Sequence, residues 1–75
     1  MVVDVVIESR NQIWGVEIKA AASATSQDIK GLLKLANVAG KRFQQGIVFY
    51  DGQATLPLNK DPAILAVPIA KLWEL

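Results

Sequence analysis

The stretch VVDVVIESRNQIWGVEIK (residues 2–19) decides the fold of this chain. It holds a nearly unbroken apolar, β-branched run over residues 2–7 and a second β-rich run that starts at Ile13 and reaches Ala20. A polar break, ESRNQ (residues 8–12), separates the two runs. Runs of this composition are typical of strands, and the short polar break predicts that they form a β-hairpin.

The register of this hairpin follows from its turn. If Arg10 and Asn11 form a two-residue turn, counting back along both strands places Asp4 opposite Glu17 on one face of the sheet. Lys19 lies two residues beyond Glu17 and therefore emerges on the same face. A turn longer by one residue would send Asp4 to the opposite face.

The rest of the chain predicts one helix and two further strands. An apolar stripe from Ile29 to Ala39 has helical spacing, Thr25 with Asp28 resembles a capping box, and Gly40 supplies a stop. The helix is expected to start near Gln27 and to cover one face of a sheet.

Residues 43–50 predict a buried strand, and the order strand, helix, strand predicts a parallel pairing. Residues 56–62 are interpreted as a loop. Residues 64–67 lie between two prolines and predict a short edge strand, and residues 69–75 predict a short final helix. The expected fold is one α/β domain over residues 1–75, with a mixed sheet of about four strands, one main helix on one face and a short C-terminal helix.

Composition restricts the chemistry. The 75 residues include no cysteine and no histidine, so a disulfide framework, a thiolate metal site and an imidazole ligand are all excluded. The net charge of +1 creates no large basic field that would attract nucleic acid. No stretch approaches the ~18 apolar residues of a membrane helix and the N-terminus does not resemble a signal peptide, so we expect a cytoplasmic protein without membrane contact.

Two carboxylates on one face are suited to a hard divalent cation. Asp4 and Glu17 would repel each other at about 5 Å unless a cation such as Mg²⁺ or Mn²⁺ lay between them. Such a metal would polarise a phosphodiester oxygen, and Lys19 would orient the attacking water. The corresponding reaction is metal-assisted hydrolysis of nucleic acid. The alternative is that Asp4, Glu17 and Lys19 form a solvated cluster of opposite charges, which would contribute little to stability.

The aspartate on one strand followed by Glu17-Ile18-Lys19 on the next resembles the core of the PD-(D/E)XK nuclease-like superfamily. The segments DVVIE, VEIK, KGLLKLA, RFQQGIVFY and AVPIAKLW resemble, in order, the uncharacterised C-terminal domain of prokaryotic AAA-type ATPases. The resemblance implies a restriction-endonuclease-like core that is truncated, because the superfamily's first helix and strand precede the aspartate strand.

The resemblance also implies roles for individual residues. Asp4, Glu17 and the carbonyl of Ile18 would bind the metal, and Asp4, Glu17 and Lys19 would be catalytic. The acid-x-Lys pattern occurs a second time at Asp28-Ile29-Lys30, but there it falls on the predicted helix, where residues two apart do not share a face. We therefore favour the strand copy.

Other residues carry weaker signals. Lys30, Lys34 and Lys41 follow one side of the helix and its end, so they could contact phosphates, although a solvated face is the simpler interpretation. Trp14 and Trp73 are expected to pack in the small core or at a subunit interface.

Two functions remain open at this point. The missing upstream elements favour a non-catalytic binding or oligomerisation module, and the alternative is a magnesium-dependent nuclease that acts through Asp4, Glu17 and Lys19. An exposed apolar sheet edge predicts a homodimer or higher oligomer, with strand exchange as one route.

Overall fold

The structure, a computed structural model, describes residues 3–74, except for the side chains of Trp73 and Glu74. The strands are β1 (Val5–Ser9), β2 (Gln12–Lys19), β3 (Phe43–Tyr50), β4 (Leu56–Asn59) and β5 (Ile64–Pro68). One α-helix, α1 (Lys30–Ala39), lies between β2 and β3, and short 3₁₀ turns are found at η1 (Ser26–Ile29), η2 (Gly40–Arg42) and η3 (Ile69–Glu74).

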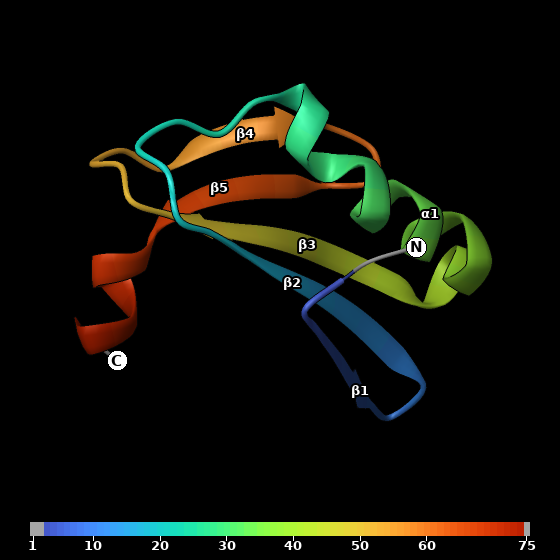
Figure 1. Ribbon diagram of the computed structural model, residues 1–75. Helices are drawn as coiled ribbons and strands as arrows, with labels where there is room; N and C mark the ends of the chain where they lie inside the picture. Colours follow the sequence, from blue (N-terminus) through green and yellow to red (C-terminus); the bar gives the residue numbers. More distant parts are fainter. Residues whose placement is uncertain (1–2, 75) are drawn as a thin grey trace.

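The five strands form one mixed sheet in the order β1-β2-β3-β5-β4 (Figure 1). The three inner strands β2, β3 and β5 are parallel, and each edge strand pairs antiparallel with its neighbour. In Figure 1, η1 and α1 lie on one side of this sheet, and η3 continues from β5 beyond the end of the strands. The α/β class, the mixed sheet, the crossover helix and the parallel pairing of β2 with β3 are confirmed.

The hairpin turn and its register are as predicted. Arg10 and Asn11 both have positive φ, 52° and 67°, which is the backbone of a tight two-residue turn. Ser9 pairs with Gln12, and the ladder continues back to the pair of Val5 with Val16. The side chains of β2 therefore alternate between two faces in the predicted phase.

Two predictions about the second half of the chain are wrong. Residues 56–59, interpreted as a loop, form the edge strand β4, so the sheet has five strands rather than about four. Consequently the strand at residues 64–68 is not at the edge but lies between β3 and β4. Pro57 misled the interpretation, because proline removes a ladder hydrogen bond and is tolerated only where the strand has a free side.

The helix begins later than predicted. Residues Ser26–Ile29 form the 3₁₀ turn η1, and α1 starts at Lys30. The predicted capping box is present, since Thr25 Oγ1 accepts a hydrogen bond from Gln27 N at 3.2 Å and Asp28 Oδ2 accepts one from Thr25 N at 2.7 Å. Gly40 ends the helix with φ of 60°, as expected for a glycine stop.

The core lies between the helical layer and one face of the sheet. Ile29 and Leu32 from the helical side meet Val48 of β3 and Ile64 of β5, and all four side chains are buried. Val3, Ala24 and Leu58 pack around this cluster. No described helix has the length and hydropathy of a membrane-spanning segment.

The opposite face of the sheet has no described helix packed across it. Strand alternation places on this face the apolar residues Val5, Ile7, Trp14, Val16, Ile18, Ile47, Phe49, Leu65 and Val67. We call this surface the open face. Trp14 was predicted to pack in the core or at an interface, and its side chain is half-buried on the open face and not in the core. The side chain of Trp73 lies outside the described part.

Two glycines let α1 approach the sheet. A Cβ atom at Gly15 would lie 2.6 Å from Leu32 Cδ2 and 2.8 Å from Leu35 Cδ2, whereas one at Gly46 would come no closer than 3.2 Å to any neighbour. Non-bonded carbon atoms normally stay at about 3.5–4.0 Å. The absence of a side chain at Gly15 therefore fixes the distance between α1 and β2.

The Gly15→Ala substitution is expected to destabilise the protein by about 1–3 kcal/mol, because two buried leucines must move to admit the methyl group. Urea unfolding followed by circular dichroism measures this change. Gly46→Ala is the matched control and should cost less, since its contacts are wider. Equal losses in the two variants would contradict this account of the helix-sheet contact.

Candidate functional site

The predicted site residues converge at one end of the hairpin. Glu17 and Lys19 lie on β2, on the face that η1 and α1 cover, and Asp4 lies just before β1. The pairing of Asp4 with Glu17 would be the next step of the ladder after Val5 and Val16. Instead, β1 begins only at Val5, and Asp4 contacts β2 through its side chain.

Asp4 is held by the backbone of β2. Its Oδ2 atom accepts a hydrogen bond from the N–H of Ile18 at 2.7 Å. The carboxylate thus occupies the place that a main-chain carbonyl would take if the ladder continued. Ile18 was predicted to offer its carbonyl to a metal; the structure shows its N–H bound to Asp4 and its side chain 54% exposed on the open face.

Lys19 does not pair with Glu17 but with Asp28. The distance from Lys19 Nζ to Asp28 Oδ2 is 2.6 Å, and both side chains are largely shielded from solvent. Because Asp28 also caps η1 through Thr25, one carboxylate joins the end of β2 to the start of the helical layer. This ion pair is the only one that the structure describes near the predicted site.

Asp28 is the residue that the sequence interpretation missed. Its acid-x-Lys motif was set aside because Asp28 and Lys30 cannot share a helical face, and this reasoning considered only partners within the same helix. The capping box was the available signal, since it places Asp28 at the start of the helical layer, where β2 also ends.

The three carboxylates influence one another. Partial burial raises the pKa of Glu17 above its usual value, and the negative charges of Asp4 and Asp28 raise it further. The hydrogen bond from Lys19 lowers the pKa of Asp28, and the bond from the Thr25 N–H contributes to the same shift. The surroundings therefore disfavour the charged form of Glu17 and stabilise the charged form of Asp28.

The described acids supply few ligands for a metal ion. Among residues 3–74, no set of three or more acidic side chains is grouped closely enough to hold one. Mg²⁺ requires near-octahedral oxygen ligands at about 2.0–2.1 Å. Asp4 Oδ2 accepts a hydrogen bond from the Ile18 N–H and Asp28 Oδ2 accepts one from Lys19, which leaves the second oxygen of each carboxylate outside the described hydrogen bonds.

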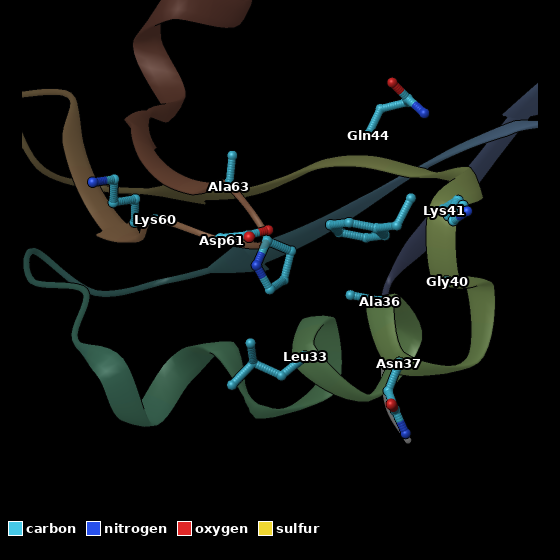
Figure 2. A pocket seen from close by; sticks show the side chains of 11 residues that line it. Leu33, Ala36, Asn37, Gly40, Lys41, Gln44, Lys60, Asp61 and Ala63 are labelled. Atoms are coloured by element: carbon cyan, nitrogen blue, oxygen red, sulfur yellow. The ribbon is translucent and has the colours of Figure 1, made fainter.

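The lysines predicted to contact phosphates lie on α1 and η2. Lys30 and Lys34 are exposed, one turn apart on α1, and Lys41 is exposed in η2. Lys41 lines a groove of about 600 Å³ between the end of α1 and the turn that joins β4 to β5 (Figure 2). Figure 2 shows Leu33 directed into this groove, with Lys60 and Asp61 on the opposite wall.

The raised pKa of Glu17 predicts that replacing it with the neutral glutamine increases the stability of the fold by an amount that depends on pH. A folded pKa above the unfolded one means that the wild type loses stability as pH rises through the folded pKa. Glu17→Gln should therefore unfold at a higher temperature than the wild type at pH 7. The difference should shrink below pH 4, where Glu17 is protonated in both states.

Thermal unfolding followed by circular dichroism at pH 3.5 and pH 7 tests this. Asp51→Asn, which removes an exposed acid after β3, serves as the control for the loss of one negative charge. A Glu17→Gln variant that is less stable than the wild type at pH 7 would show that the charged carboxylate is stabilised by a contact other than those described.

Comparison with known proteins identifies the family but not the activity. No protein of curated function and no solved structure is significantly similar to the chain. A family model described as a domain of unknown function (DUF4143) matches residues 3–72. The match spans the hairpin, α1 and all the remaining strands, which is nearly the whole chain. The chain therefore belongs to the DUF4143 domain family.

Proposed function

We propose that this chain is a non-catalytic binding or oligomerisation module that contacts its partner through the open face. We also propose that its fold is of the PD-(D/E)XK nuclease-like type. The order of hairpin, crossover helix and parallel strand supports that relationship, with an acid and a lysine on the second hairpin strand. In this proposal the inherited residues serve structure and not chemistry.

The single observation that carries the proposal is the apolar character of the open face. Parallel strands normally have both faces covered, because their side chains are apolar on both sides. Here β2, β3 and β5 are parallel, yet the described helix α1 covers one face only. Val5, Ile7 and Ile18 remain about half exposed, and none of the described strand residues on the open face is charged.

The contacts of the acidic cluster agree with a structural role. Lys19 is engaged by Asp28, and Asp4 is engaged by the backbone of Ile18. A lysine that orients water would first have to leave Asp28. The pairs instead join β1, β2 and η1, which orders the hairpin beneath the helical layer.

A charge on the open face is expected to disrupt association. Ile18→Lys should weaken self-association or partner binding at least tenfold, because a lysine ammonium would have to be desolvated in an apolar contact. Sedimentation velocity between 1 and 200 μM measures the effect. Val38→Lys is the matched control, since Val38 is 78% exposed on α1 and should change nothing.

Equal effects of the two lysines would count against the open face. A wild type that stays monomeric at 200 μM, and that fails to bind an apolar surface dye more strongly than Ile18→Lys does, would sink the proposal.

A magnesium-dependent nuclease is the second candidate. The observation that favours it is the mutual repulsion of Asp4, Glu17 and Asp28, which a bound cation would relieve. The candidate requires the carboxylates to rearrange, with Lys19 released from Asp28. Lys30, Lys34 and Lys41 are the exposed lysines that would contact the phosphates.

Calorimetric titration with Mn²⁺ separates the two candidates. For the module we expect no saturable binding below 1 mM and no cleavage of single-stranded or double-stranded DNA or RNA. The nuclease candidate predicts a site that is lost in Asp4→Ala and Glu17→Ala and retained in Asp51→Ala, an acid outside the cluster. Cleavage that persists in Glu17→Ala would point to a contaminating enzyme.

A further inference from the structure

The groove beside α1 is formed by the middle of the chain. Its lining residues fall between Leu33 and Ala63, and it lies between α1 and the turn that joins β4 to β5 (Figure 2). Its volume of about 600 Å³ is in the range of sites that bind ligands, about 300–1,000 Å³. None of its lining residues belongs to the open face or to the acidic cluster.

Apolar side chains line the groove on both of its walls. Leu33 and Ala36 come from α1, Phe43 comes from the start of β3, and Pro62 and Ala63 come from the turn before β5. Leu33 is 37% exposed and is directed into the groove (Figure 2). An apolar side chain of a partner placed here would cover Leu33 and would itself leave water, which favours binding.

Lysines border this apolar lining. Lys41 and Lys60 are part of the lining, and Figure 2 shows them at opposite ends of the groove. Lys30 and Lys34 each lie three residues before a lining residue of α1, and residues three apart are neighbours on a helix surface. All four lysines are exposed.

These four lysines exceed the acids that could neutralise them. Residues 29–50 contain no acidic residue, and Asp61 is the only acid among the lining residues. Within residues 3–74, the described salt bridges are made by Lys19 and Arg42, so none of the four lysines takes part in one. Since the whole chain has a net charge of only +1, its positive charge is concentrated around the groove.

We infer that the groove binds an acidic segment of a partner protein, with an apolar side chain of that segment inserted between α1 and the turn before β5. The carboxylates on either side of the inserted side chain would lie near the lysines. This inference goes beyond the proposed function, because it concerns a second surface and a partner that is recognised by charge.

The dimensions favour a peptide segment over a small molecule. Helix α1 has 10 residues, so it extends about 15 Å at about 1.5 Å per residue. An extended segment covers that length with about five residues at about 3.3 Å each. A compact organic acid bound between Lys41 and Lys60 would leave Lys30, at the first residue of α1, without a partner.

The lining also favours protein over nucleic acid. Proteins that bind single strands stack successive bases on aromatic side chains, and Phe43 is the only aromatic residue in this lining. The carboxylate of Asp61 would repel a phosphate, whereas it can accept a hydrogen bond from a peptide N–H. We therefore expect an oligonucleotide to bind this groove more weakly than an acidic peptide does.

Nuclear magnetic resonance titration of the ¹⁵N-labelled chain tests this inference. The ligand is a synthetic peptide with blocked ends, Glu-Asp-Leu-Phe-Asp-Glu. Its controls are Gln-Asn-Leu-Phe-Asn-Gln, which lacks the charges, and Glu-Asp-Ser-Ser-Asp-Glu, which lacks the apolar side chains. The acidic peptide should shift the amide signals of residues 33–44 and 60–63 in a saturable manner, and should bind at least tenfold more tightly than either control.

Two variants should weaken binding of the acidic peptide at least fivefold: Leu33→Ser, which removes apolar lining, and Lys41→Glu, which reverses a charge. Val38→Ser is the control for the first, because Val38 is 78% exposed on α1 and is not part of the lining. Lys71→Glu, on η3, is the control for the change in net charge. Both controls should bind the peptide within twofold of the wild type, and circular dichroism confirms that each variant is folded.

Several results would overturn the inference. These are the absence of saturable shifts at 2 mM peptide, shifts confined to the open face, and equal losses in Leu33→Ser and Val38→Ser. Equal binding of the serine peptide would remove the role of the apolar lining. A 12-nucleotide single-stranded DNA that shifts the same signals at lower concentration than the peptide would assign the groove to nucleic acid instead. The sedimentation measurements on Ile18→Lys test the open face separately, so either surface can fail without the other.

Discussion

The turn at Arg10 and Asn11 is the constraint on which the rest of the structure depends. Two residues with positive φ set the register of β1 against β2, and side chains alternate with a period of two. The turn length thereby decides that Val6 lies on the helical side beside Gly15, while Val5 and Ile7 lie on the open face with Val16 and Trp14. A shift by one residue would turn every β1 side chain to the other face and place Val5 or Ile7, instead of Val6, beside Gly15 in the glycine row that receives α1.

That glycine row explains how so short a chain forms a core. A 75-residue domain has little apolar surface to bury, so each contact between helix and sheet must be close. Gly15 and Gly46 lie side by side on adjacent strands, and Leu32 packs over both of them. Helix α1 is consequently fixed over β2 and β3.

The sequence predicted the local features well and the lateral arrangement less well. The hairpin register, the capping box and the Gly40 stop follow from short-range chemistry, and each is present. Strand β4 could not be predicted, because Leu56–Asn59 contains a proline and is strand-like only through its pairing with β5. Asp28 was missed for a related reason, since its partner Lys19 comes from a strand and not from its own helix.

The irregular edge strand β4 has a consequence for how far assembly can proceed. A sheet with two receptive edges can add subunits without end, and this is the route by which edge-to-edge pairing produces fibrils. In this chain, Pro57 and the irregular ladder of β4 oppose strand addition at one edge. The same proline that hides β4 in the sequence therefore keeps that edge from extending the sheet.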